Sequence, residues 1–108
     1  MHTFGVGSGH IDLSRWVEVC CTRPAEIFGL ERKGRLSPGC DADIVLFDPQ
    51  REVALSAGTL HSALPFSSYE GVTLHGFPVT TVSRGEVIVE AGAFVGAAGR
   101  GRFVERGY

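Results

Sequence analysis

The stretch PGCDADIVLFDP, residues 38–49, decides how the chain is organised. Its run IVLF is continuous and partly β-branched, which is typical of a strand buried on both faces. A Pro-Gly pair interrupts the chain before this run, and Pro49 is expected to end it. The pattern therefore predicts two short strands, over residues 34–37 and 42–47, on either side of the break.

The same stretch contains side chains that could bind a metal ion, namely Cys40, Asp41, Asp43 and Asp48. A metal site needs several protein ligands that converge on one point. The histidines show no H-x-H or H-x3-H spacing; they are His2, His10, His61 and His75. We therefore predict a structural role, in which Asp41 caps the turn and Asp43 opens the strand beside an Arg or Lys.

Two helices are predicted before this strand. Asp12 is a suitable N-cap for the segment LSRWVEVCC. The residues on one face of that helix, at i, i+3, i+4 and i+7, are Leu13, Trp16, Val17 and Cys20. Pro24 ends the helix or starts the next one, PAEIFGL, which Gly29 stops. Residues 1–11 are rich in glycine and expected to be irregular.

More strands are predicted after residue 50. REVALSAG is a further short strand candidate, and residues 56–71 show no period and are expected to form a loop. VTTVSRGEVIVEAG predicts a hairpin, with strands over 79–83 and 86–90 joined by a turn at Arg84-Gly85. Two helices followed by five or six strands indicate an α+β fold with a mostly antiparallel sheet.

The hydrophobic core is predicted from these elements. Its helical part is expected to consist of Trp16, Val17, Ile27 and Phe28. Its sheet part is expected to consist of Ile44, Val45, Leu46, Val79, Val82, Val87 and Val89. The helical set is expected to be buried on one side of the core, and the second set to form the core of the sheet.

Composition excludes several classes of protein. The chain has 108 residues, 44% hydrophobic and 20% charged, which suits one globular domain. A net charge of −2 provides no basic field for nucleic acid and no polybasic membrane anchor. No apolar run is long enough to span a bilayer, and the first ten residues do not resemble a signal peptide. Three cysteines, two of them adjacent, predict reduced and buried thiols in a cytoplasmic protein.

Other catalytic candidates are weak. GVGSG at residues 5–9 follows no strand and lacks the lysine of a phosphate-binding loop. His61 has serines nearby, at positions 62, 67 and 68, but no G-x-S-x-G elbow occurs. GRGRF at residues 99–103 is a single copy of an RNA-binding type of element in an acidic chain. We therefore predict no catalytic, cofactor-binding or metal-binding residue in this chain.

Four segments in order resemble the C-terminal end of the dihydropyrimidinase and hydantoinase family of cyclic amidohydrolases. They are IDLSRWVEVCCTRPAEIFGL, RKGRLSPGCDADIVLFDP, YEGVTLHGFPVTTVSRGEVIVEAGAFVG and GRGRF. The G-x-D-A-D-I-V run and its flanks are specific to cyclic amidohydrolases, and the last two segments point to the hydantoinase branch. SALPFSSYEG differs from the family's usual Asp-Tyr before the YEG turn. The resemblance extends from about residue 4 to the end of the chain.

The resemblance implies a metal-dependent hydrolase with a TIM barrel, two metal ions and a small composite β-sandwich. The family's ligands are an H-x-H pair, a carboxylated lysine, two further histidines and an aspartate, and none of these motifs occurs here. The chain is expected to divide into the helical end of the barrel region (1–32), part of the sandwich (33–98) and a tail (99–108). The resemblance also implies that Asp41 and Asp43 are structural and that the sandwich is completed by strands from the enzyme's N-terminus.

We therefore expect a structural and assembly segment of a hydantoinase- or dihydropyrimidinase-like hydrolase, without the catalytic centre and inactive alone. The alternatives are a non-catalytic homologue, a stand-alone β-sandwich interaction module or an allantoinase-type tail. The abrupt start at Met1 is expected to reflect a fragment, a truncated reading frame or a decayed gene. Expected partners are further copies of the chain or the missing barrel, because the sheet would otherwise expose an edge. The tail over 99–106 is expected to lie across a neighbour.

Overall fold

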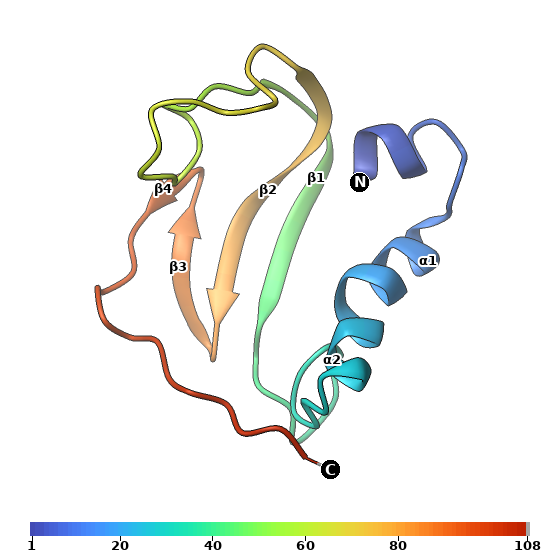
Figure 1. The fold of residues 1–108 in the computed structure, drawn as a ribbon, viewed down its shortest axis with the longest axis vertical. Coiled ribbons are helices and arrows are strands. Elements are labelled where there is room, and N and C mark those ends of the chain that lie inside the picture. The colour runs from blue at the N-terminus through green and yellow to red at the C-terminus, as the bar shows by residue number, and fades with distance from the viewer. Residues whose placement is uncertain (108) are drawn as a thin grey trace.

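The computed structural model describes residues 1–107, which form a helical arm beside an antiparallel sheet. The helical arm comprises η1 (His2–Val6), α1 (Leu13–Val17), η2 (Glu18–Thr22) and α2 (Arg23–Ile27), where η marks wider π-helical turns. The strands are β1 (Ile44–Ala54), β2 (Thr73–Ser83), β3 (Glu86–Glu90) and β4 (Ala93–Phe94), paired in the order β1-β2-β3-β4. Figure 1 shows the helical arm alongside β1. This agrees with the predicted mixture of helices and antiparallel strands, although the sheet has four strands rather than five or six.

The main helix runs without a break from Leu13 to Ile27. Its predicted N-cap is confirmed, because the Asp12 carboxylate accepts the Arg15 N–H at 2.7 Å. Pro24 sits in the first turn of α2. A proline has no N–H and crowds the carbonyl four residues earlier, and the π-turn of η2 gives that carbonyl room. The two predicted helices therefore form one, and a positive φ of 64° at Gly29 ends it.

The N-terminal segment is more ordered than predicted. Residues His2–Val6 form the helical turn η1, whereas residues 1–11 were expected to be irregular. The turn is attached to β2, because the Thr3 hydroxyl donates to the His75 carbonyl at 3.0 Å and accepts the His75 N–H at 3.1 Å. The rings of His2, Trp16 and Phe47 also contact one another, and this cluster connects the turn, the helix and β1.

The structure corrects three predictions on and around residues 38–49. Strand β1 begins at Ile44 and passes through Pro49, which was expected to end it, and it includes part of the separate strand proposed after residue 50. Asp48 pairs with Phe77 and Glu52 with His75, so residues 49–51 bulge opposite one residue of β2. Such a bulge tolerates a proline because its residues leave the hydrogen-bonding ladder. Residues 34–37 form bends and irregular backbone instead of the predicted strand.

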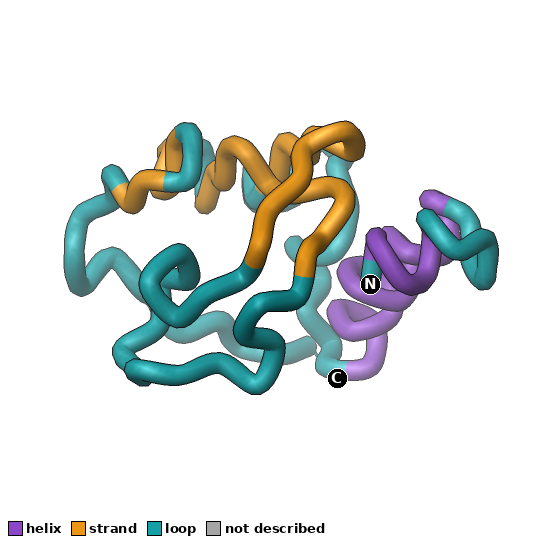
Figure 2. The backbone as a smooth tube through the Cα atoms, turned by 90° about the horizontal axis from the view of Figure 1, so that it is seen from above, coloured by secondary structure: helices purple, strands orange, loops and turns teal. Residues whose placement is uncertain are grey.

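The predicted hairpin and loop are confirmed. Strands β2 and β3 pair through Ser83 and Glu86, and Arg84 and Gly85 between them have φ values of 49° and 80°. Two positive φ values match the right-handed twist of a tight hairpin. Residues 56–71 contain no helix or strand. Figure 2 shows this loop and the tail running below the sheet, while the helices lie to one side.

The core is much thinner than predicted. Among the described residues, the buried hydrophobic side chains are Ala25 and Leu55, exposed to 7% and 8%. Several predicted core residues are instead exposed: Val17, Ile27, Phe28, Val45, Leu46 and Val87. The others are half-buried: Trp16, Ile44, Val79, Val82 and Val89. Val45 and Leu46 are neighbours in a strand and point to opposite faces, so neither face of β1 is fully covered within this chain.

Candidate functional site

The acids of the decisive stretch surround a single lysine. Lys33 Nζ lies 2.9 Å from Asp41 Oδ2 and 2.5 Å from Asp43 Oδ2. The other Asp41 oxygen binds the Arg32 guanidinium at 2.8 Å. The other Asp43 oxygen accepts the backbone N–H of Arg84 at 2.8 Å. We call Arg32, Lys33, Asp41, Asp43 and Arg84 the Lys33 cluster.

The charges in the Lys33 cluster stabilise one another. The Lys33 ammonium lowers the pKa of the Asp41 carboxyl from its usual value, and the nearby Arg32 adds to this effect. Lys33 also lowers the pKa of Asp43, with help from the Arg84 N–H. In return, Asp43 and then Asp41 raise the pKa of Lys33. Carboxylates held in this way stay ionised at neutral pH and are occupied by cations, so they suit neither acid–base catalysis nor metal binding.

The Lys33 cluster joins three parts of the chain. Lys33 follows the helix, Asp43 precedes β1, and Arg84 is in the turn between β2 and β3. The predicted pairing of Asp43 with a Lys or Arg is therefore present. Asp41 does not cap the turn as predicted, because its carboxylate binds Arg32 and Lys33 while a Cys40 N–H bond to the Ser37 carbonyl closes the turn. Sequence reasoning did not identify Lys33 and Arg84 as partners, although the K-G dipeptide and the hairpin turn were visible.

The remaining candidate ligands of that stretch are separate from the cluster. The Asp48 carboxylate accepts the Gln50 N–H at 2.9 Å, which supports the bulge in β1. The Cys40 thiol is half-buried. Within residues 1–107 no three His, Cys, Asp or Glu side chains are grouped so as to hold a metal ion.

The two metal ions that the family resemblance implies do not fit the side chains of this chain. His75 Nδ1 pairs with Glu52 at 2.9 Å, and His2 Nδ1 lies 2.8 Å from the His75 carbonyl oxygen. These contacts use both rings for local hydrogen bonds and provide no third convergent ligand. Since Asp41 and Asp43 are bound to Lys33, a dinuclear centre has no donor set among the described residues.

The two adjacent cysteines are not placed as predicted. Cys20 and Cys21 were expected to be buried near a helix end, but both are exposed. They lie in η2, in the middle of the continuous helix. The prediction failed because it assumed that the helix is covered by the rest of this chain.

The serines near His61 support local turns. The hydroxyls of Ser62 and Ser67 accept the backbone N–H groups of Leu64 and Tyr69, at 3.1 and 3.2 Å. This is the usual role of a serine that begins a turn, and it directs both hydroxyls to the backbone. The centroid of the His61 ring instead lies 6.4 Å from the centroid of the Phe94 ring.

The glycine-rich segments are also used structurally. In GVGSG, the Gly7 N–H bonds the His2 carbonyl and the Gly9 N–H bonds the Val6 carbonyl, so these amides are occupied by the chain itself. In GRGRF, Arg100 donates to the Ser83 carbonyl at 2.8 Å and pairs with Glu86 at 3.0 Å, while Arg84 donates to the Arg100 carbonyl. These bonds attach the tail to the hairpin turn. Tyr108, the last residue of the predicted tail, lies outside the described residues.

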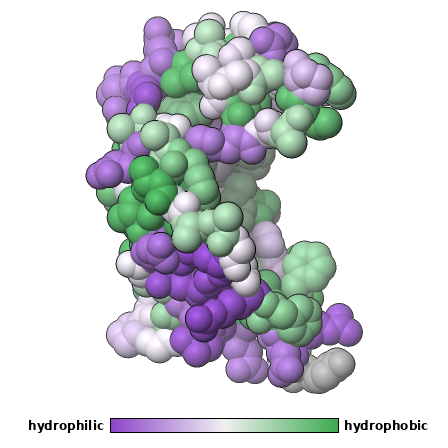
Figure 3. Space-filling view, turned by 90° about the vertical axis from the view of Figure 1, so that its left-hand side faces the viewer, coloured by the Kyte–Doolittle hydropathy of each residue, from purple (hydrophilic) through white to green (hydrophobic). Residues whose placement is uncertain are grey.

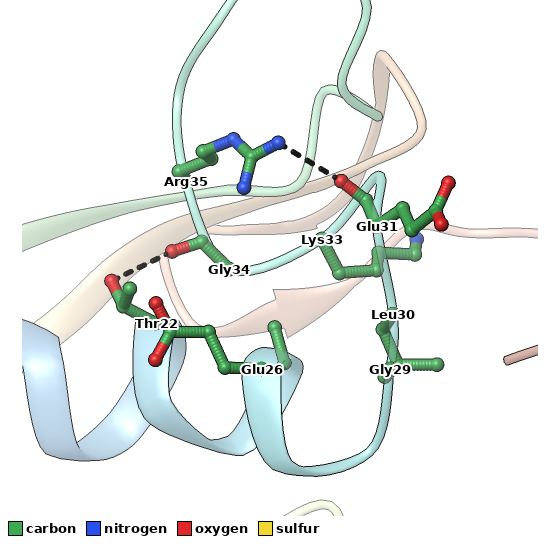
Figure 4. Close-up of a pocket in the computed structure, with 9 residues that line it drawn as sticks. Thr22, Glu26, Gly29, Leu30, Glu31, Lys33, Gly34 and Arg35 are labelled. Atoms are coloured by element: carbon green, nitrogen blue, oxygen red, sulfur yellow. Dashed lines mark hydrogen bonds between the residues drawn. The ribbon is translucent and has the colours of Figure 1, made fainter. Parts of the chain in front are cut away.

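A shallow pocket of about 440 Å³ lies between the helix and the loop that follows it. Figure 4 shows the Thr22 hydroxyl donating to the Gly34 carbonyl, at 3.1 Å, and Arg35 donating to the Glu31 carbonyl, at 3.2 Å. A Cβ at Gly34 would lie 2.5 Å from the Ala25 Cβ, so the loop touches the helix directly. The pocket therefore lies between two packed segments, and Lys33 is one of the residues that line it.

The most extensive feature of the surface is its exposed apolar area. Large hydrophobic side chains with more than half of their surface exposed occur on the helix, on β1, in the loop and in the tail; they include Leu13, Ile27, Val45, Phe66 and Phe103. Figure 3 shows apolar groups at the surface on the side of the molecule away from the helices. No helix in the described part of the chain is long and apolar enough to cross a membrane. So many exposed large apolar side chains in one chain are more than scattered single surface residues.

Comparison with known proteins identifies relatives over nearly the whole chain. The model of the amidohydrolase family matches residues 1–88. The D-hydantoinase of Rhizobium radiobacter is 46% identical over 103 residues, which are 94% of this chain and 22% of that protein. The dihydropyrimidinase of Rattus norvegicus is 48% identical over 103 residues, which are 20% of its length. The chain thus spans about a fifth of the length of these relatives.

Solved structures show the same fold. A D-hydantoinase structure matches 95% of this chain with a TM-score of 0.92 and 44% identity, and the match covers 23% of that protein. The dihydropyrimidinase from Brevibacillus agri NCHU1002 matches 97% of this chain with a TM-score of 0.93 and 40% identity, again over 23% of its length. The arrangement of helical arm and sheet is therefore one that these proteins contain within much longer chains.

Proposed function

Because the chain belongs to the amidohydrolase family, we propose that it is a C-terminal structural and assembly segment of a hydantoinase- or dihydropyrimidinase-like hydrolase. The observation that carries this proposal is the unequal coverage: nearly all of this chain matches D-hydantoinase, at a TM-score of 0.92, but only 23% of D-hydantoinase is matched. A segment that keeps this fold and exposes its apolar faces is suited to pack against the remainder of such an enzyme.

The parent reaction in this proposal is hydrolysis of a cyclic amide C–N bond by a metal-activated water. The metal ligands would belong to the rest of the enzyme, since the carboxylates of this segment are bound to Lys33. We therefore assign no chemical step to the described residues. Their role is to hold the helix, the sheet and the tail in one arrangement through the Lys33 cluster and the Arg100 contacts.

We further propose that the sheet is the C-terminal part of the composite β-sandwich of this enzyme. Two observations support this reading. Among the described residues β1 pairs with β2 alone, so its other edge has no strand partner. Val45 and Leu46, on opposite faces of β1, are exposed to 55% and 53%. An open edge and two partly bare faces are what a sheet offers to further strands.

A chimeric enzyme tests the proposal directly. The matching segment of the Rhizobium radiobacter D-hydantoinase is replaced by residues 1–107 of this chain, and hydantoin hydrolysis is measured. We expect a soluble enzyme that hydrolyses hydantoin. A matched pair of variants sharpens the test: Val45→Asp should abolish the chimera's activity if other strands cover that side chain, whereas Arg15→Gln, at an exposed ion pair, should not.

The second candidate is a stand-alone interaction module or non-catalytic homologue, which the exposed apolar surface also favours. The same chimera distinguishes the two. A chimera that folds and stays inactive, while the unmodified D-hydantoinase is active in parallel, would contradict the hydrolase proposal and leave the module as the better account.

A further inference from the structure

The tail over residues 99–107 is fastened at both of its ends. At its start, the Arg100 guanidinium donates to the Ser83 carbonyl at 2.8 Å and pairs with the Glu86 carboxylate at 3.0 Å. The Arg84 guanidinium in turn donates to the Arg100 carbonyl. Figure 1 shows the tail running from β4 past the turn between β2 and β3 to the end of α2. We call these contacts of Arg100 the hairpin latch.

At the other end of the tail, a backbone hydrogen bond attaches it to the helix. The Gly107 N–H donates to the Gly29 carbonyl at 2.7 Å. The two backbones approach closely, because a Cβ at Gly29 would collide with the Gly107 carbonyl oxygen and a Cβ at Gly107 would lie 2.5 Å from Glu31 Oε1. Gly29 and Glu31 also line the pocket between the helix and the loop, so this end of the tail lies beside that pocket. We call the contact between Gly107 and Gly29 the helix latch.

The two latches differ in strength. The hairpin latch joins a guanidinium to a carboxylate and a carbonyl, and the Arg100 side chain is only 19% exposed. The helix latch rests on a hydrogen bond between two neutral backbone groups. Hydrogen bonds with an ionised partner are roughly twice as strong as neutral ones. The helix latch should therefore open more often than the hairpin latch, as the less stable parts of a fold do.

Between the latches the tail is open to solvent. Residues 101–106 are exposed and form no helix or strand, and the Phe103 side chain is 90% exposed. A Cβ at Gly99 or at Gly101 would meet no atom within 4 Å, so no packing restrains the backbone on either side of Arg100. Such glycines can absorb the change in backbone angles that a hinge requires.

We propose that residues 101–107 form a flap, hinged at Gly101, that swings away from the helix when the helix latch opens while the hairpin latch stays closed. Opening frees the Gly29 carbonyl beside the pocket and carries Phe103 away with the flap. This inference goes beyond the proposed function, because it concerns the motion of the tail and does not depend on the parent reaction.

Limited digestion with trypsin distinguishes the two latches, because trypsin cleaves after arginine and must bind the arginine side chain. Cleavage after Arg102 needs only an open flap, whereas cleavage after Arg100 also needs Arg100 to leave Ser83 and Glu86. In the wild-type chain we expect mass spectrometry to show a faster initial cleavage after Arg102 than after Arg100. Equal initial rates, or faster cleavage after Arg100, would overturn the proposed order of opening.

A variant of the helix latch tests the flap itself. Gly29→Ala should raise the rate of cleavage after Arg102 about fivefold or more, because its Cβ displaces Gly107 and removes the hydrogen bond. Gly39→Ala is the matched control, since it also places a side chain at a positive φ but in open space, and it should leave this rate unchanged. Cleavage after Arg51, in the bulge of β1, monitors the whole fold in each variant.

The hairpin latch is tested in parallel. Glu86→Gln removes the charged partner of Arg100 and should raise cleavage after Arg100, which Gly29→Ala should leave near its wild-type rate. Two results would overturn the inference. One is a Gly29→Ala chain whose rate after Arg102, relative to that after Arg51, equals the wild-type ratio. The other is a Gly29→Ala chain in which cleavage after Arg100 rises as much as cleavage after Arg102, because the tail would then open as one piece.

Discussion

Lys33 holds together segments that are far apart in the sequence, because both Asp41 and Asp43 bind its ammonium. The sequence alone indicated that the two aspartates are structural, since they lack convergent partners for a metal. It did not identify the cation, because several of the ten Lys and Arg residues could have reached them. Which cation pairs with the two aspartates depends on the loop that brings Lys33 back towards β1. No local sequence pattern specifies the path of that loop.

The Lys33 cluster should make stability depend on acid pH. Asp41 and Asp43 have pKa values below their usual 3.8, so their ion pairs fully stabilise the fold at neutral pH and are lost as pH falls through the lowered values. Lys33→Met should flatten this acid dependence, measured as the urea midpoint at several pH values below neutral. The variant Arg15→Met removes a more exposed pair, in which solvent screens the lowering of the Glu18 pKa, and should change the profile less than Lys33→Met does. Parallel profiles for wild type and Lys33→Met would contradict this role.

At high pH the sign is opposite. The pKa of Lys33 is raised, so its contribution is complete below its usual value of 10.5 and disappears only as pH rises above that value. Between these limits the Lys33 cluster is fully charged. Stability near neutral pH should therefore be insensitive to its titration.

Gly34 should tolerate no side chain, because both its conformation and its surroundings exclude one. Its φ is +79°, and a Cβ would lie 2.5 Å from the Ala25 Cβ and 2.6 Å from the Cys21 carbonyl oxygen. Gly39 is the matched control, with a φ of +88° and open space around it. Gly39→Ala should cost about 1–2 kcal/mol through backbone strain, and Gly34→Ala clearly more. Equal losses in urea denaturation would show that the contact with the helix does not matter.

At the scale of elements, the sequence predicted the helix start, the hairpin and the loop over 56–71, because each depends on short-range chemistry. Asp12 caps the helix, and Arg84-Gly85 adopts the turn that a two-residue hairpin requires. The sequence prediction failed at two prolines, where the surrounding backbone accommodates a residue that usually ends an element. Pro49 was expected to end β1, but a bulge opposite β2 accommodates it and the strand continues. Pro24 was expected to separate two helices, but a π-turn carries the helix past it.

The core prediction failed for a different reason. The period of each element correctly indicates which residues avoid water in a complete fold, but not whether the covering layer belongs to this chain. Val17 and Val45 have the pattern of core residues and are exposed to 52% and 55%. Their pattern alone therefore does not place them in a core within residues 1–107.

Leu55 should be one of the few side chains whose truncation destabilises the isolated chain. It is 8% exposed, and its backbone closes the base of the loop through bonds of 2.9 Å to Val72 and 2.8 Å to Gly71. Leu55→Ala should cost about 2 kcal/mol or more, because it leaves a cavity. Leu36→Ala removes the same atoms at a site that is 73% exposed and should be nearly neutral. A similar urea midpoint for both variants would place the core elsewhere.

At the scale of the whole molecule, we expect the isolated chain to bind no metal ion tightly. The purified chain should hold less than one equivalent of zinc after dialysis and should not open hydantoin or dihydrouracil, because its carboxylates are paired with cations and its histidines do not converge. Elemental analysis and an assay of ring opening check this. One or two ions held tightly per chain would contradict the assignment of the metal ligands to another part of the enzyme.

Stability should also depend on protein concentration, since few side chains are buried within one copy. The radius of gyration is 15.2 Å, against about 13 Å for a compact domain of this length. Folding linked to dimerisation makes a tenfold increase in concentration worth about 1.4 kcal/mol, which should raise the melting temperature by roughly 3 °C for two chains of this size. Calorimetry over a hundredfold range of concentration measures the slope. A wild-type melting temperature that stays constant over this range would mean that each copy folds alone, and the apolar surface would then have to be stable in water without a partner.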